Sequence, residues 1–260
     1  MSRSAFSLAE LRVRLAGIGS AVAASAPPAP AVTTGAVQVD ARLRGLARAA
    51  LHEIFAADAD DASPAAGFAI LLARRGASDK PVIWVREDRG ERGQGRLYAP
   101  GLVELGVDPA AILLVTGADA LAVLRAGADI IGCGAVGAVV IEPWGKAPAL
   151  DLTVSRRLAL AAAQSGVLTL VLRSDVDPGP SAATTRWSVR AAPSPMLAAS
   201  APGHPAFDIS LLRHRGGITG FDARVEWDRD RNSFRDAALS RGIPADAAGG
   251  TPAHGRRRAA

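Results

Sequence analysis

Five short apolar runs, each separated from the next by a segment with helical periodicity, constrain the fold of this 260-residue chain. The runs predict strands, which are LHEIF at 51–55, PVIWVR at 81–86, AILLVT at 111–116, GAVVIE at 137–142 and VLTLVL at 167–172. The helices predicted between them cover 63–75, 97–105, 118–131 and 151–165. Strands that are apolar on both faces and alternate with helices predict a mainly parallel sheet with flanking helices, an α/β fold.

The pattern changes after this alternation and differs at both ends of the chain. A helix is predicted at 38–49, before the first strand, and antiparallel C-terminal strands are predicted at 184–192, 207–215 and 222–230. We therefore expect one folded core from 38 to 243. Residues 244–260 are rich in small residues, end in an arginine cluster at 256–258, and predict a disordered basic tail.

Residues 1–24 predict an amphipathic N-terminal helix with one apolar stripe. The stripe consists of Leu8, Leu11, Leu15 and Ile18 at alternating spacings of three and four. A proline- and alanine-rich segment at 25–37 predicts an extended linker between this helix and the core. Such a helix either packs on its own core or docks on another subunit or partner, and the stripe residues are the candidates for that contact.

Composition excludes several classes of protein. Cys133 is the only cysteine and no apolar run reaches membrane-spanning length, so we expect a reducing, cytoplasmic setting without membrane contact. The four histidines show no zinc-ligand spacing, which predicts no metal site. The net charge of +5 permits an anionic partner, but the chain's strong bias to arginine over lysine weakens that inference.

The loop after the first predicted strand lacks every residue of a phosphate-binding loop. Such a loop uses glycines to surround phosphates, a lysine to neutralise them and a Ser/Thr to hold Mg²⁺. Residues 56–66 contain no glycine or lysine, and Asp58, Asp60 and Asp61 there would repel phosphate. Neither lysine of the chain is followed by Ser or Thr. We expect a degenerate nucleotide site without a bound cofactor, in which Asp61 or Ser63 caps the next helix.

Two glutamates follow predicted strands at the end of the sheet where ligands bind in open α/β folds. Glu142 ends GAVVIE, where P-loop enzymes hold Mg²⁺ with a carboxylate, and Glu87 could orient a water in an active relative. The alternative is a salt-bridged or solvated strand end. Because the phosphate loop is missing, we favour that alternative for both residues.

Basic and aromatic residues in the second half of the chain suggest contact with single-stranded DNA through phosphates and base stacking. The candidates are Trp144, Lys146, Arg186, Trp187 and Arg190, with Arg213, Arg215 and Arg224 adding positive charge. The alternative is that the arginines are outward-facing residues of strands.

The order of these elements resembles that of RecA recombinases. YAPGLVELGVDPAAILLV (98–115) is similar to the RecA segment in which a helix ends in an L-G-V-D turn before a strand. LHEIF, PVIWV and TTRWSVRAAPS (184–194) resemble segments of the ImuA family, RecA-like proteins of bacterial mutagenesis cassettes. The resemblance covers about residues 38–230 and implies a RecA-like fold, but without a phosphate loop RecA's ATPase cycle does not transfer.

The same resemblance implies a function in the SOS response to DNA damage. ImuA proteins work with ImuB, an inactive Y-family polymerase homologue, and with an error-prone C-family DNA polymerase in translesion synthesis. We therefore expect a non-catalytic accessory protein that acts by protein–protein contact and whose N-terminal helix mediates self-association or docking on a partner. Two alternatives remain open: a DNA-dependent ATPase with an atypical phosphate loop that uses Glu142 and Glu87, and a SulA-like inhibitor of cell division.

Overall fold

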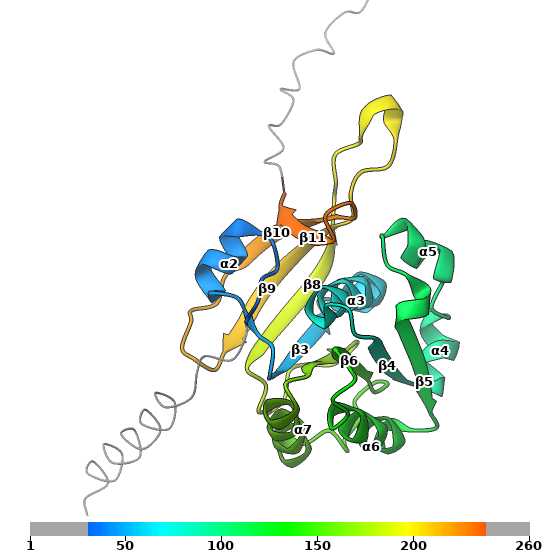
Figure 1. Cartoon of the computed structure of the whole chain (residues 1–260), viewed down its shortest axis with the longest axis vertical. Helices are drawn as coiled ribbons and strands as arrows, with labels where there is room; N and C mark the ends of the chain where they lie inside the picture. The colour runs from blue at the N-terminus through cyan, green and yellow to red at the C-terminus, as the bar shows by residue number, and fades with distance from the viewer. Residues whose placement is uncertain (1–30, 238–260) are drawn as a thin grey trace, which may run out of the picture.

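The computed structural model describes residues 31–237, and its main feature is a nine-stranded sheet formed between Leu51 and Asp236 (Figure 1). Its parallel strands are β3 (Leu51–Ala56), β4 (Val82–Glu87), β5 (Ile112–Gly117), β6 (Ala138–Glu142), β7 (Leu168–Arg173) and β8 (Thr185–Ala192). Its antiparallel strands are β9 (Ala206–His214), β10 (Asp222–Asp228) and β11 (Ser233–Asp236). The order across the sheet is β11-β10-β9-β8-β3-β7-β6-β4-β5. The predicted α/β class, with a mainly parallel sheet and antiparallel C-terminal strands, is confirmed.

One predicted antiparallel strand joins the two parts of the sheet. β8 pairs in parallel with β3 on one side and antiparallel with β9 on the other. The prediction that the segment at 184–192 belongs to an antiparallel group is therefore right for one neighbour and wrong for the other. A local residue pattern specifies which side chains alternate along a strand, but not which strand lies beside it.

Helices cover both faces of the sheet and create two apolar cores. On one face α3 (Ala62–Ala77) packs against β3, β4, β6, β7 and β8, and buries Phe68, Leu71 and Leu72. On the opposite face α6 (Ala120–Ile131) and α7 (Leu152–Ser165) pack on the parallel strands and on each other. Burial on both faces explains why β3, β4, β6 and β7 read as almost continuous apolar runs.

Two short helices follow β4 and lead to the edge strand β5. They are α4 (Asp88–Gln94) and α5 (Ala99–Glu104), of which only α5 falls within a predicted helix. α4 contains two glycines and five charged or amide residues, so its sequence has no apolar period to detect. Short 3₁₀ turns complete the described elements at Ala59–Asp61, Pro109–Ala111 and Ala198–Ser200.

The helix predicted at 38–49 is shorter than expected. α2 spans Val37–Leu43 and ends because Arg44 and Gly45 both adopt positive φ angles, 57° and 86°. The chain then forms β2 (Leu46–Ala47), which pairs with β1 (Ala31–Val32). The folded unit thus already includes the last residues of the segment 25–37 that was predicted as a linker.

The remaining predictions at the chain ends lie outside the described residues. These are the helix at 1–24 with Leu8, Leu11, Leu15 and Ile18, and the tail at 244–260. Among residues 31–237, the structure contains no helix long and apolar enough to cross a membrane.

Candidate functional site

The loops that follow the parallel strands gather at their carboxyl ends, where open α/β sheets bind ligands. The loop after β3 carries the three predicted aspartates. Asp61 is the N-cap residue of α3, as one of the two predicted caps, but its Oδ1 accepts a hydrogen bond from the Ala191 N–H at 2.9 Å instead of from the helix. Asp58 pairs with Arg190 at 3.4 Å, and Asp60 is exposed. Three aspartates thus precede or begin α3, at the helix end where a phosphate would bind.

Glu142 is held by protein groups. Its Oε2 accepts from the Trp84 Nε1–H at 2.8 Å and lies 3.3 Å from Nε of Arg86, and only 5% of the residue is exposed. Burial raises the pKa of Glu142, while Arg86 and the Trp84 hydrogen bond act in the opposite direction. These contacts fit the salt-bridged strand end that we favour. Ser63, which is exposed, shares with Glu142 a cavity of about 240 Å³ between α3 and α5.

Glu87 is hydrogen-bonded to the backbone of the loop after β6. Its Oε2 accepts from the Trp144 N–H at 3.1 Å, and the residue is buried. The Trp144 ring packs on the side of α4 that carries Gly90 and Gly93. A Cβ atom added to Gly93 would lie only 2.6 Å from the ring. Trp144 is therefore half-buried and packed, whereas Lys146 in the same loop is exposed.

Two of the candidate DNA contacts lie inside the protein. Trp187 is 2% exposed and donates its Nε1–H to Thr185 Oγ1 at 2.7 Å, which leaves no ring face for base stacking. Arg186 is buried in an ion pair with Glu53 at 2.7 Å. The predicted DNA contact therefore does not extend to these two residues, because β8 is an interior strand of the sheet. Arg190 is exposed, although paired with Asp58.

The central strands carry a buried charged cluster that the sequence analysis did not predict. Besides the Glu53–Arg186 pair it contains Arg173, whose Nη2 donates to the carbonyl oxygens of Gly145 at 3.1 Å and Lys146 at 2.9 Å. Burial lowers the pKa of Arg173 and the charge of Glu53 raises it. The signal was available, since Glu53 interrupts the apolar run LHEIF. The cluster fixes the loop after β6 and gives these charges a structural role.

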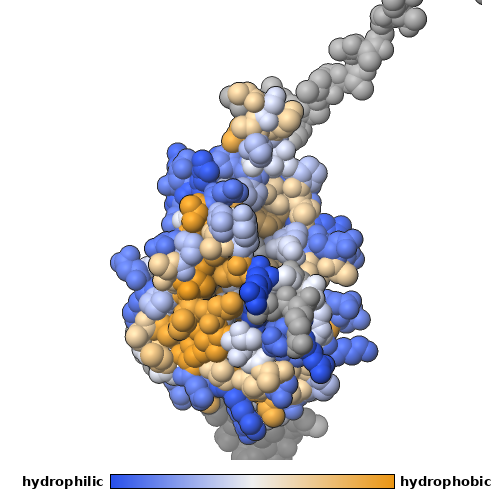
Figure 2. Space-filling view, turned by 90° about the vertical axis from the view of Figure 1, so that its right-hand side faces the viewer, coloured by the Kyte–Doolittle hydropathy of each residue, from blue (hydrophilic) through white to orange (hydrophobic). Residues whose placement is uncertain are grey.

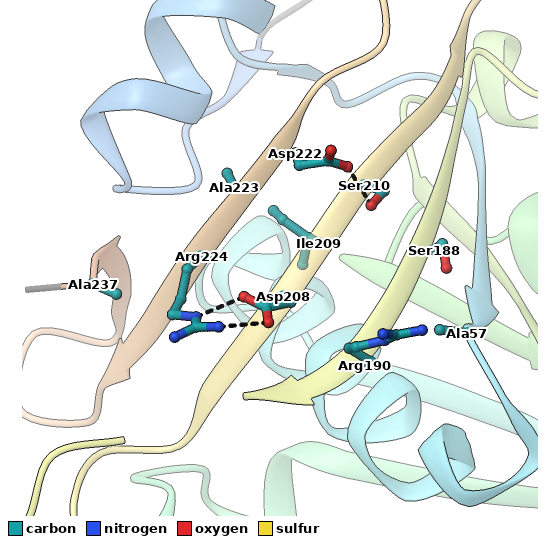
Figure 3. A pocket seen from close by; sticks show the side chains of 10 residues that line it. All are labelled: Ala57, Ser188, Arg190, Asp208, Ile209, Ser210, Asp222, Ala223, Arg224 and Ala237. Carbon is teal, nitrogen blue, oxygen red and sulfur yellow. Dashed lines mark hydrogen bonds and ion pairs between the residues drawn. The ribbon is translucent and has the colours of Figure 1, made fainter. Parts of the chain in front are cut away.

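A shallow hollow lies on the outer face of β8, β9 and β10 (Figure 3). Arg224 donates to both carboxylate oxygens of Asp208, at 2.7 and 2.8 Å, and Ser210 donates to Asp222 at 2.5 Å. Because opposite charges are paired with one another across this face, it presents no net field that would select an anion or a cation.

A different surface is formed by the edge strand β5. Leu113 and Leu114 are exposed there, together with Val103 of α5 and Leu121 of α6. Figure 2 shows a continuous apolar area on this side of the molecule. No charged residue or proline occurs from 110 to 118, although edge strands of monomeric proteins usually carry such residues to prevent pairing.

The opposite edge of the same sheet is protected in the usual ways. β11 is four residues long, Arg235 pairs with Glu226 at 2.7 Å, and Asp236 accepts from the Gln38 N–H of α2 at 3.1 Å. The contrast between the two edges marks β5 as the side available to a partner. Within residues 31–237 no group of His, Cys, Asp and Glu side chains could hold a metal ion.

Comparison with known proteins identifies relatives over most of the chain. No protein-family model matches the chain. It is 32% identical over 212 residues to Protein ImuA from two strains of Caulobacter vibrioides, which covers 74% of this chain and 82% of the relative.

Proposed function

The chain belongs to the ImuA family, and on this premise we propose that it is a non-catalytic accessory protein of SOS-induced, error-prone translesion DNA synthesis. It acts by contact with an ImuB-type Y-family homologue and an error-prone C-family polymerase, which supplies the catalysis. Its core is a RecA-like fold with a degenerate phosphate loop. The observation that carries the proposal is the unprotected apolar edge β5.

A strand edge of this kind supports function through protein contact. A partner strand that pairs with β5 satisfies main-chain N–H and C=O groups and at the same time covers Leu113 and Leu114. Val103 and Leu121 extend the apolar area to the flanking helices, so the partner buries apolar surface on both sides of the new strand. We assign the ImuB-type partner to this edge.

The carboxyl-end loops support the absence of catalysis. A nucleotide there would meet Asp58, Asp60 and Asp61 without a lysine to offset them. Glu142, the candidate Mg²⁺ ligand of the ATPase alternative, is occupied by Trp84 and Arg86. DNA-stimulated ATP hydrolysis that Glu142→Ala abolishes is the result that would favour the ATPase alternative. Binding to the tubulin-like division protein would favour the SulA-like alternative.

The direct test is retention of the ImuB-type partner on immobilised protein. We expect the double variant Leu113→Asp/Leu114→Asp to lower retention at least about tenfold, because two charges would have to be buried in the contact. Leu160→Asp is the matched control, since Leu160 of α7 is as exposed as Leu113 but lies on another surface. Retention of the double variant at the level of the control would show that β5 is not the contact.

A further inference from the structure

Arginines gather at the amino end of β3, the opposite end of the sheet from the carboxyl-end loops. They come from the C-terminal end of α2 and the segment before β3, and from the turn that follows β9. The members of this group, the basic end, are Arg42, Arg44, Arg48, Arg213 and Arg215. All are exposed except Arg48, which is half-buried.

Contacts within the core fix these segments beside one another. The buried His52 side chain bonds to Ala47 O at 2.8 Å and to Thr185 Oγ1 at 2.7 Å, and Thr185 lies opposite His214 in the β8–β9 register. The N–H of Arg215 donates to Thr184 O at 2.8 Å. The segment before β3 is thereby joined to the end of β9.

A second link connects α2 to the turn after β9. The Arg42 guanidinium lies 4.9 Å from the centre of the Phe221 ring, a cation–π contact. In Figure 1 the turn between β9 and β10 lies next to α2. The two chain segments of the basic end therefore lie side by side.

No acidic residue belongs to either segment. Residues 41–52 and 209–221 contain no Asp or Glu, and within the described part of the chain no ion pair involves a member of the basic end. The situation is reversed on β8, β10, β11 and the turn after β10, where every one of the following arginines pairs with a carboxylate: Arg190, Arg224, Arg229, Arg231 and Arg235. The chain's positive charge is thus neutralised on one part of the surface and left uncompensated on the other.

We propose that the basic end binds the phosphate backbone of nucleic acid. Arginine offers a planar fork of donors that matches phosphate oxygens. The charges are spread over two segments rather than gathered in one pocket, which suits a polymer with repeated charges better than a single anion. Gly216 and Gly217 after Arg215 also let a backbone approach closely. This surface is separate from Trp144, Lys146 and Arg190, and from the apolar edge β5.

The test uses the full chain and measures anisotropy of a labelled 20-nucleotide oligothymidylate and a 20-base-pair duplex at several salt concentrations. For Arg213→Ala/Arg215→Ala we expect roughly tenfold weaker binding at 0.1 M salt, because two phosphate contacts are lost. Each lost contact should also lower the slope of log K against log salt concentration by about 0.7 for a single strand. Arg42→Ala/Arg44→Ala should weaken binding similarly. All four side chains are exposed, but Arg42 also contacts Phe221, so we expect an unchanged unfolding temperature for Arg213→Ala/Arg215→Ala and a small decrease for Arg42→Ala/Arg44→Ala.

The control variant is Arg229→Ala/Arg231→Ala, which removes the same charge from exposed, ion-paired positions. Equal weakening by control and test variants would overturn the proposal, because it would indicate a general effect of net charge. Unchanged binding by both test variants would overturn it too, and would place the contact elsewhere. Competition by polyglutamate as strong as by DNA would mean that the basic end binds acidic protein instead. None of these outcomes bears on the partner contact at β5.

Discussion

Acid should destabilise this protein through one buried histidine. His52 is completely buried, and because Ala47 O can only accept, its Nε2 carries the proton and its Nδ1 accepts from the Thr185 hydroxyl. That hydroxyl in turn accepts from Trp187 Nε1. A proton added to Nδ1 would meet a hydroxyl oriented as a donor. Burial lowers the pKa of His52 to about 4, the Ala47 hydrogen bond raises it, and His214 lowers it further.

The sign and size of the effect follow from linkage. Unfolded His52 titrates near 6.5 and folded His52 near 4, so between these values the unfolded state binds more protons and folding stability falls as pH falls. The gap of about 2.5 pH units corresponds to about 3 kcal/mol when crossed completely, at about 1.4 kcal/mol per unit. Most of this loss should be present at pH 4.5, whereas none is expected at pH 7.

The assay is urea unfolding of the wild type and His52→Gln at pH 7 and pH 4.5. Glutamine cannot titrate, so the variant, although less stable at pH 7, should lose about 2 to 3 kcal/mol less than the wild type between the two pH values. Glu142, whose raised pKa acts in the opposite sense above its unfolded value, contributes equally to both proteins and cancels. An identical loss in the variant and the wild type would refute the assignment of the acid effect to His52.

Three further predictions concern association, the core and nucleotide binding. Charged substitution of Leu11 and Leu15 should abolish self-association or partner docking in light scattering and pull-down, and if both persist the apolar stripe has no such role. Glu53→Gln should lower the free energy of unfolding by about 3 kcal/mol, because it leaves the buried Arg186 charge without its carboxylate partner. Asp208→Asn removes the carboxylate of an exposed ion pair and should lower it by less than about 1 kcal/mol. Titration with Mg-ATP should produce neither calorimetric heat nor a thermal shift, and saturable binding with millimolar or better affinity would contradict the degenerate site.

The central strands could be predicted because burial on both faces requires almost every residue of the strand to be apolar. Ile54 and Val140 lie in runs that only a covered parallel sheet explains. The direction of side chains at the candidate site could not be predicted. Trp187 and Arg186 have the composition of a DNA-binding strand, but Trp187 packs in the core and Arg186 reaches Glu53, a residue 133 positions earlier. Such contacts depend on strand order, which no local pattern encodes.

The carboxylates at the carboxyl ends of the strands have structural roles. Asp61 satisfies the Ala191 N–H at the end of β8, Glu87 fixes the Trp144 N–H, and Glu142 holds the Trp84 indole. Each of these carboxylates therefore satisfies a hydrogen-bond donor. A buried donor left without this partner would cost about 1–3 kcal/mol of stability. Inserting a lysine after β3 would not restore a phosphate site, because Asp58, Asp60 and Asp61 would remain, and removing Asp61 would leave the Ala191 N–H without that partner. The stability of this end of the sheet and the binding of nucleotide thus make opposite demands on the same residues. We infer that the protein acts through its surfaces, the apolar edge β5 and the basic end.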